Sequence, residues 1–410
     1  MPNSSGLYPR QLADRIRHDL GVYPAVAIMG ARQVGKTTLA RLIGQEFGLA
    51  YCSLDEQGIR QQALEDPTGL IESVAETGAV FDEVQRAPDL LLSLKTVVDR
   101  EQRNGRFVLT GSNQPRVSQH VADSLVGRVA YRTLRPLTLS EQREDALSGR
   151  WTNFFDLTGE SLEGALGEAA RLSGQLDWQS VTTTGGMPRA LAAPTADRLQ
   201  VLDDYLQTFA RRDIRDILAV ESVERLEQFL RLIAARTGAE LNYSSVAGDL
   251  GQSPKTIHRW IEVLERSYLV TLIQPYSRNA SSRVIKRPKL FMVDPALAVA
   301  GSGDPTPSGF HFETLVANDL LAWRDDGPGR GLFYWRLASG QEVDFVLSQG
   351  PRLVPVEVKC SAEIGRSDAR HLRFFLDQYP EAGIGVLLSS DPTIRWLGDR
   401  IIAAPWWAVL

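Results

Sequence analysis

The chain has 410 residues, 43% of them hydrophobic and 23% charged, which is typical of a soluble protein with more than one domain. Its net charge of −5 excludes a chain that is basic overall, so any nucleic-acid surface has to be a local patch. The two cysteines are too few for a disulfide framework and indicate a reducing, cytoplasmic compartment. The sequence has neither the apolar core of a signal peptide nor a long apolar run, so we expect a protein that is neither secreted nor membrane-spanning.

Residues 25–37 combine an apolar strand, a glycine-rich loop and a helix start. Gly30–Thr37 reads G-x-x-x-x-G-K-T directly after the apolar run Ala25–Met29. In such a loop backbone N–H groups surround phosphates, Lys36 reaches the β- and γ-phosphates, and the Thr37 hydroxyl binds Mg²⁺. The sequence therefore predicts an ATP·Mg²⁺ site. The predicted nucleotide-binding residues of the loop are Gly30, Arg32, Gln33, Val34, Gly35, Lys36, Thr37 and Thr38.

Apolar runs then alternate with helical stretches, which predicts a mostly parallel sheet covered by helices. The predicted strands are 25–29, 50–54, 79–82, 107–111 and 129–134. The third ends in Asp82 and Glu83, the Walker B form. Asp82 would hold Mg²⁺ through water, and Glu83 would polarise the water that attacks the γ-phosphate.

Three later residues are candidates for contact with the γ-phosphate. Ser112 and Asn113 follow the fourth strand, at the carboxyl end where ligands bind in open α/β sheets, although a turn explains these residue types equally well. Arg128 precedes the fifth strand and would stabilise charge on the transferred phosphoryl group, in cis or across a subunit interface. The alternative for Arg128 is an ordinary surface charge.

Five motifs together resemble the bacterial and archaeal AAA-type ATPases that carry a C-terminal domain of unknown function with a nuclease-like fold. The motifs are Gly30–Thr37, Val80–Glu83, Leu109–Asn113, Leu125–Arg128 and Gly185-Gly186-Met187-Pro188. The resemblance implies an ATPase domain over residues 1–180 and a helical lid over 181–225. It also implies a homo-oligomer, because AAA-type sites often borrow an arginine from the neighbouring subunit.

Residues 226–300 are predicted to form a winged helix-turn-helix. A helix from Leu241 leads to a turn with Gly251, and a second helix starts with Ser253 as N-cap and Pro254 at its first position, followed by a strand over 268–274. The stretch from Lys255 to Lys289 forms a local basic patch, which predicts nucleic acid, and DNA in particular, as partner. Its further members are Arg266, Arg278, Arg283, Lys286 and Arg287. Alternatively, the domain packs internally and its bases are only solvated. The predicted DNA contacts are Lys255, Thr256, His258 and Arg259.

Residues 301–410 read as helix, three strands, helix and strand. On these elements lie three acids and a lysine: Glu313, Asp344, Glu357 and Lys359. Their order resembles that of the PD-(D/E)-x-K nuclease superfamily. The resemblance implies that Asp344 and Glu357 hold Mg²⁺ and that Lys359 orients or deprotonates the attacking water. Such folds also persist as binding modules, in which the same side chains form only an ion-pair network.

The expected fold is thus α/β: a P-loop AAA-type parallel sheet with a helical lid, a winged helix-turn-helix and a nuclease-like α/β domain. The first functional hypothesis is an ATPase that couples turnover to nucleic-acid binding or processing. The second is a nucleotide-dependent switch that binds DNA or a protein partner without cleaving it, and a toxin–antitoxin component is a third. The rate of turnover separates the first two, because a switch hydrolyses slowly.

Overall fold

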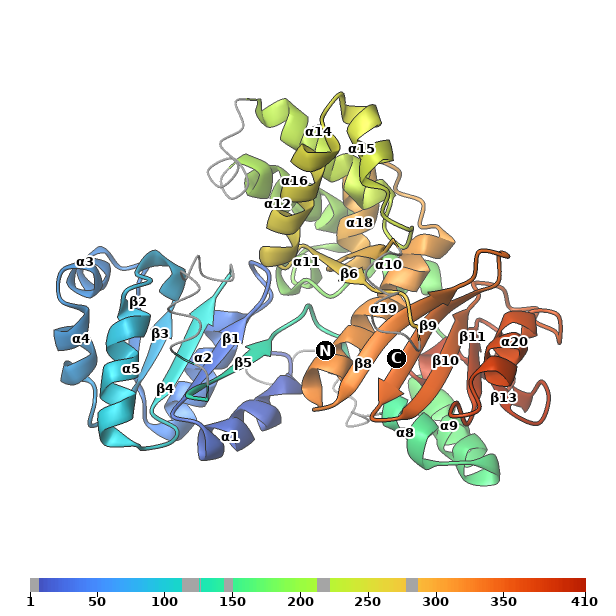
Figure 1. Cartoon of the computed structure of the whole chain (residues 1–410), viewed down its shortest axis with the longest axis horizontal. Coiled ribbons are helices and arrows are strands. Elements are labelled where there is room, and N and C mark those ends of the chain that lie inside the picture. Colours follow the sequence, from blue (N-terminus) through green and yellow to red (C-terminus); the bar gives the residue numbers. More distant parts are fainter. Residues whose placement is uncertain (1–6, 113–124, 126, 144–149, 212–221, 278–286) are drawn as a thin grey trace. The chain divides into compact units, whose positions relative to one another are not determined.

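The structure, a computed structural model, describes residues 7–112, 125, 127–143, 150–211, 222–277 and 287–410 (Figure 1). The chain divides into two compact units. The P-loop unit comprises residues 8–136 and 266–269, and the C-terminal unit comprises 137–265 and 270–410. In the described part of the chain, no helix has both the length and the apolar character needed to cross a membrane.

The P-loop unit contains a five-stranded, entirely parallel sheet in the order β2-β3-β4-β1-β5. All five predicted strands are confirmed, each within a residue of its expected bounds. The strands are β1 (Ala25–Met29), β2 (Ala50–Ser53), β3 (Ala79–Asp82), β4 (Phe107–Gly111) and β5 (Val129–Thr133). The α-helices are α1 (Leu12–Val22), α2 (Lys36–Phe47), α3 (Gln57–Glu65), α4 (Pro67–Ser73) and α5 (Leu90–Glu101).

Every residue of β1 is buried, as expected for a central strand covered on both faces. Its side chains alternate between the two faces, and Ala25, Ala27 and Met29 enter a core that α4 and α5 also supply. Strand β4 lies between β1 and β3. The carboxyl ends of these three strands are therefore neighbours, which brings the P-loop, the residues after Gly111 and the acids after β3 to one edge of the sheet.

The C-terminal unit combines helices with two sheets. Its six-stranded mixed sheet has the order β12-β13-β11-β10-β9-β8, and the second sheet is the antiparallel pair β6-β7. The strands are β6 (Val270–Ile273), β7 (Lys289–Met292), β8 (Arg330–Arg336), β9 (Glu342–Gln349), β10 (Arg352–Val358), β11 (Gly385–Ser389), β12 (Arg395–Trp396) and β13 (Ile401–Pro405). The α-helices are α7 (Leu139–Gln142), α8 (Arg150–Asp156), α9 (Gly159–Ser173), α10 (Trp178–Thr184), α11 (Pro188–Leu191), α12 (Arg198–Phe209), α14 (Val223–Ala235), α15 (Tyr243–Leu250), α16 (Pro254–Arg266), α18 (Pro295–Ser302), α19 (Gly309–Asp326) and α20 (Arg370–Gln378).

The expected order of helix, three strands, helix and strand after residue 309 is confirmed as α19, β8 to β10, α20 and β11. The sequence did not predict β12 and β13. Strand β13 pairs with β11 in parallel and is buried along its whole length. A buried apolar run of five residues has no alternation, so its periodicity does not distinguish a strand from a core helix.

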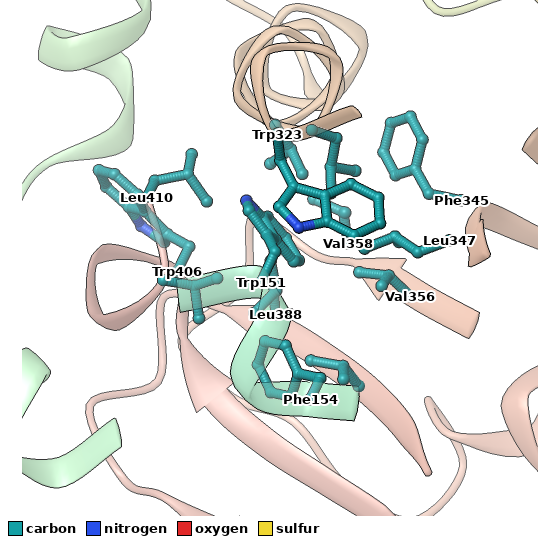
Figure 2. Close-up of a cluster of buried hydrophobic side chains, with 14 of the residues drawn as sticks. Trp151, Phe154, Trp323, Phe345, Leu347, Val356, Val358, Leu388, Trp406 and Leu410 are labelled. Atoms are coloured by element: carbon teal, nitrogen blue, oxygen red, sulfur yellow. The ribbon is translucent and has the colours of Figure 1, made fainter. Parts of the chain in front are cut away.

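Residues 137–180 belong to the C-terminal unit, whereas the sequence placed them in the ATPase domain. The reason is burial: Trp151 and Phe154 of α8 pack with Trp323 of α19 and with side chains of β9 and β10 (Figure 2). The Trp151 indole N–H also donates to Asp319 Oδ1 at 2.6 Å. A tryptophan with its polar atom satisfied in a core fixes α8 against the C-terminal sheet.

Helices α15 and α16 lie where the helix-turn-helix was predicted. The Ser253 hydroxyl accepts the Thr256 backbone N–H at 3.0 Å and so caps α16, as its position in the sequence indicated. Val246 and Ile257 are fully buried between the helices, and the Trp260 ring meets Phe229 of α14 edge to face at 5.1 Å. The assignment of these helices and β6-β7 as a winged helix-turn-helix remains a prediction.

The chain after β6 joins the six-stranded sheet through backbone hydrogen bonds. Tyr334 of β8 donates its N–H to the Gln274 oxygen at 3.2 Å, and the Tyr276 N–H donates to the Tyr334 oxygen at 2.6 Å. Pro275 and Tyr334 form a parallel bridge. The two-stranded sheet is therefore attached to the edge of the larger one.

Glycine is required at position 186 by a close approach of backbone to backbone, and at position 185 by a left-handed φ of 64°. Leu137 donates its N–H to the Gly186 oxygen at 2.8 Å, and the Gly186 N–H donates to Asp294 Oδ2 at 2.6 Å. Asp294 also caps α18 by accepting the Leu297 N–H at 3.0 Å. Burial raises the pKa of Asp294 to about 6, although these backbone donors oppose the rise. The motif therefore joins three segments of the C-terminal unit.

Gly186→Ala is expected to lower the free energy of unfolding by about 3 kcal/mol, because the new Cβ would lie 2.1 Å from the Leu137 carbonyl oxygen and only a backbone shift relieves that overlap. Urea unfolding followed by circular dichroism measures the change. Gly164→Ala in α9 is the matched control: its Cβ meets nothing within 4 Å, so stability should stay equal or rise slightly. Equal stability of the two variants would contradict this account of the motif.

Candidate functional site

The loop after β1 has the backbone shape that a phosphate cradle needs. Gly30 and Gly35 adopt φ values of 150° and 98°, and Gln33 is also left-handed at 62°. A Cβ on Gly30 would lie 2.2 Å from the Leu134 carbonyl oxygen, so no other residue fits there. Helix α2 begins at Lys36, and no side chain caps its N-terminus. Its first N–H groups therefore face the loop and are available for an anion.

Lys36 lies inside this loop. Its Nζ donates to the carbonyl oxygens of Gly30 at 3.0 Å and Ala31 at 2.7 Å, and the residue is 4% exposed. Burial lowers the pKa of Lys36 to about 8, and the nearby carboxylates of Glu83 and Asp82 limit the fall. A phosphate in the loop would add negative charge beside the ammonium and favour its charged form.

Arg10, which precedes α1, forms hydrogen bonds with the backbone of the phosphate loop. Its guanidinium donates to the Val34 oxygen at 2.7 Å and to the Arg135 oxygen. The P-loop is thereby joined to the segment after β5. Sequence reasoning did not assign this role, because the contact spans residues far apart in the chain and a lone arginine carries no pattern.

The Asp82 carboxylate, at the carboxyl end of β3, accepts hydrogen bonds from three hydroxyl groups. Thr37 Oγ1 donates to its two carboxylate oxygens, at 2.9 Å and 3.0 Å, the Tyr51 hydroxyl donates at 2.8 Å, and Thr110 Oγ1 is a third donor. The predicted Mg²⁺ residues Thr37 and Asp82 are thus in contact, and a hydroxyl beside a carboxylate is a donor set that suits Mg²⁺. Tyr51 and Thr110 were missed, since polar residues inside strands carry no motif.

Glu83 has a strained backbone, with φ of 63° in a residue other than glycine. Its N–H donates to Thr110 Oγ1 at 3.1 Å. Its carboxylate accepts hydrogen bonds from the Ser112 hydroxyl at 3.2 Å and from the Gln85 side-chain amide. The predicted base and the predicted γ-phosphate sensor Ser112 therefore meet. The other sensor candidate, Asn113, lies outside the described residues.

Arg128 is not brought to this site within one chain. Its carbonyl oxygen accepts the Ala25 N–H at 3.2 Å, which places it at the amino end of β1. The P-loop is at the opposite end, roughly 16 Å away at about 3.3 Å per strand residue. The guanidinium forms an ion pair with Asp99. A role for Arg128 in cis does not fit this position, and a role across a subunit interface remains a prediction.

The other predicted residues of the loop differ in exposure. Val34 is fully buried, so its side chain is part of the core. The side chains of Arg32, Gln33 and Thr38 are exposed. Contact of these three with a nucleotide remains a prediction, and backbone N–H groups rather than side chains would make most of the loop's phosphate contacts.

A second cluster of charges lies in the C-terminal unit, around a cavity of ≈430 Å³. The four predicted residues line it together: Glu313 of α19, Asp344 of β9, Glu357 of β10, and Lys359 just after β10. Asp344 Oδ2 accepts the Val358 N–H at 2.9 Å, and Lys359 Nζ donates to Glu357 Oε1 at 2.6 Å. The sequence-predicted set thus gathers at one place.

Burial raises the pKa of both Glu313 and Glu357 above the usual value for a glutamate, and the neighbouring Asp344 raises both further. Glu357 is 4% exposed, and its Oε2 has no hydrogen-bond partner. The raised pKa values show that the cavity crowds several acidic groups together and that Lys359 alone does not compensate for them.

The missing positive charge is Lys289 of β7. Its Nζ lies 2.6 Å from Glu342 Oε1, 3.6 Å from Glu313 Oε2 and 3.7 Å from Asp344 Oδ1. Burial alone would lower the pKa of Lys289, but Asp344, Glu313 and Glu342 raise it above its usual value. Lys289 was predicted to belong to the solvated basic patch, and this prediction is wrong because the residue is only 4% exposed. Three other members of the patch, Arg278, Arg283 and Lys286, lie outside the described residues.

Mg²⁺ at Asp344 and Glu357 does not fit this arrangement, because an ammonium already lies beside Asp344. Within the residues that the structure describes, no three His, Cys, Asp or Glu side chains are placed to hold a metal ion.

The predicted DNA contacts lie on the first two turns of α16. Lys255, His258 and Arg259 are exposed and Thr256 is partly exposed. The first three line a cavity of ≈550 Å³ with Tyr243 of α15, whose ring is 5.0 Å from that of His258. The cavity thus has two bases beside aromatic surface, and the acid Glu262 also lines it.

Three regions of the chain match three different family models. Residues 22–142 match the family model of the AAA domain, residues 175–308 match a domain of unknown function (DUF8612), and residues 308–409 match another (DUF4143). The protein Rv2008c of Mycobacterium tuberculosis is 26% identical over 97% of this chain and 83% of its own length. The protein MJ1637 of Methanocaldococcus jannaschii is 22% identical over 65% of this chain and 59% of its own.

Two solved structures are similar at low identity. The Walker-type ATPase paby2304 of Pyrococcus abyssi is 16% identical, with a TM-score of 0.42, over 73% of this chain and 97% of the other. The Holliday junction branch migration motor RuvB of Thermotoga maritima is 16% identical, with a TM-score of 0.30, over 70% and 98%.

Proposed function

We propose that this chain, whose residues 22–142 form an AAA-type P-loop ATPase domain, hydrolyses ATP and couples the turnover to nucleic-acid binding at α16. The observation that carries the proposal is the contact of Thr37 with Asp82, next to a Glu83 that reaches Ser112. The residues proposed as metal site, base and sensor lie at the carboxyl ends of three adjacent strands, beside the open N-terminus of α2.

In the proposed reaction the loop N–H groups and Lys36 bind the phosphates. Bound Mg²⁺, held by Thr37 and Asp82, would neutralise charge on the β- and γ-oxygens. Glu83 orients the attacking water and accepts its proton. Its bonds to Ser112 and Gln85 hold the carboxylate at the γ-phosphate end of the site.

Nucleic-acid binding is proposed for the exposed start of α16. The support is local charge: Lys255 and Arg259 face solvent one turn apart, with His258 between them and Tyr243 beside it. A chain with a net charge of −5 needs such a patch to attract a polyanion.

Phosphate release measured with and without single- and double-stranded DNA tests the coupling. DNA is expected to stimulate release by wild type, and Lys255→Glu with Arg259→Glu should abolish the stimulation while basal release remains. Arg171→Glu with Arg373→Glu, two exposed bases elsewhere in the C-terminal unit, is the control with the same change in net charge. DNA stimulation that survives the α16 substitutions would remove α16 from the proposal, and its loss in both double variants would indicate a general charge effect.

A nucleotide-dependent switch is the second candidate. The observation that favours it is the lysine within the acid cluster, which points to a C-terminal unit that binds without cleaving. A switch would hydrolyse ATP about once in many minutes, and nucleic acid would change its assembly state rather than its rate. Phosphate release combined with size-exclusion chromatography in ATP separates the two candidates.

A further inference from the structure

Lys289 lies in the middle of the acid cluster rather than at its rim. Three carboxylates, those of Glu342, Glu313 and Asp344, lie within 3.7 Å of its Nζ, from two different elements. It is 4% exposed, and its ammonium also lies over the Tyr334 ring, 5.6 Å from the ring centre. Lys359 makes a separate pair with Glu357, which also lines the cavity.

The backbone holds Lys289 in this position. It is the first residue of β7, where it pairs with Ile273 of β6, and it also forms a bridge with Glu240. The chain that leaves β6 is hydrogen-bonded to Tyr334 of β8, directly next to the cluster. The ammonium therefore enters the cluster because the two-stranded sheet is attached to the six-stranded one.

The cluster remains open to a further cation on the side of Glu357. The Glu357 side chain is buried, its Oε2 has no hydrogen-bond partner, and it lines the cavity together with Lys289 and Asp344. An unpaired, buried carboxylate oxygen is costly unless a positive group is close. Without Lys289, the acids that line this cavity would be Glu240, Glu313, Glu342, Asp344 and Glu357, and its remaining basic side chains would be Arg336, Lys359 and His371.

We propose that Lys289 acts as a built-in cation of this cluster, so that its ammonium and a divalent metal ion at Glu313, Asp344 and Glu357 exclude one another. Two positive groups within a few ångströms in a buried site repel strongly. A metal ion therefore reaches these carboxylates only when the lysine is replaced. The inference concerns the C-terminal unit alone and does not depend on ATP binding or on α16.

Mn²⁺ binding to the full chain, measured by isothermal titration calorimetry without nucleotide, tests the proposal. Lys289→Met is expected to gain a Mn²⁺ site at least about ten times tighter than any in wild type, and Asp344→Asn in the same background should remove it. Lys289→Arg keeps the positive charge and should gain no site. A folded Lys289→Met variant that binds no more Mn²⁺ than wild type overturns the proposal, as does an equal gain in Lys289→Arg.

A second measurement needs no change at position 289. Mn²⁺ binding by wild type is expected to be the same as by the single variant Asp344→Asn, since the metal does not use Asp344 while the lysine is in place. A Mn²⁺ site in wild type that Asp344→Asn abolishes overturns the proposal even if every Lys289 variant fails to fold. Because nucleotide is absent throughout, failure of the ATPase proposal leaves both results unaffected.

Discussion

Glu83→Gln is expected to slow ATP hydrolysis by about 100-fold or more while ATP still binds, since a general base contributes about 10²–10⁴ to the rate. Glutamine keeps the shape of the side chain and its bonds with Ser112 and Gln85 but does not accept the proton of the attacking water. Phosphate release at saturating ATP measures the rate, and a fluorescent ATP analogue measures binding.

Glu72→Gln is the matched control for this substitution. Glu72 is an exposed carboxylate of α4 in the same unit, where it pairs with Arg100. Its substitution should leave both the rate and the affinity as in wild type, because surface pairs contribute little. An unchanged rate in Glu83→Gln would show that another group accepts the proton. Loss of binding together with rate would instead assign Glu83 to the shape of the nucleotide site.

Lys36→Met is expected to weaken ATP binding by at least about 100-fold. Hydrogen bonds to charged groups contribute about 1.5–3 kcal/mol each, and 1.4 kcal/mol corresponds to a factor of ten in affinity, so the loss of two phosphate contacts gives this effect. The ammonium already lies in the loop, bound to the carbonyl oxygens of Gly30 and Ala31. The measurement is a titration with a fluorescent ATP analogue.

The same substitution should not destabilise the protein without nucleotide. Burial lowers the pKa of Lys36 to about 8, so the site without nucleotide stabilises the ammonium less well than water does. Methionine has a similar length and no charge, so the Tm without ligand should equal or exceed that of wild type. Lys95→Met on α5 is the control and should leave ATP affinity unchanged. A Tm that falls by several degrees in Lys36→Met alone would mean that its lost affinity reports unfolding.

Much of the P-loop unit could be predicted from local patterns. Its strands are short apolar runs bounded by turns, and the phosphate loop, Asp82 and Glu83 are contiguous motifs whose chemistry follows from their spacing. The partners of these residues were not predictable in the same way. Tyr51 and Thr110 reach Asp82 from two other strands, and their role depends on strand order rather than on neighbours in sequence.

The C-terminal unit shows more clearly which parts of a site cannot be predicted from the sequence. Glu313, Asp344, Glu357 and Lys359 were expected to lie together, and the structure brings them to one cavity. Lys289 was missed because it is separated from Glu313 by 24 positions and lies among other bases, where composition indicates a solvated patch. Only the pairing of β6 with β7 and the bonds to β8 turn it inward.

The attachment of residues 274–276 to β8 also bears on how copies of this chain associate. An open strand edge is a template for pairing with another molecule, and β8 is an edge strand of the six-stranded sheet. Its backbone groups at Tyr334 are already bonded to Gln274 and Tyr276, and the strand at the opposite edge, β12, has only two residues. Strand addition is thus hindered at Tyr334 on one edge, and the other edge offers a strand of only two residues as a template.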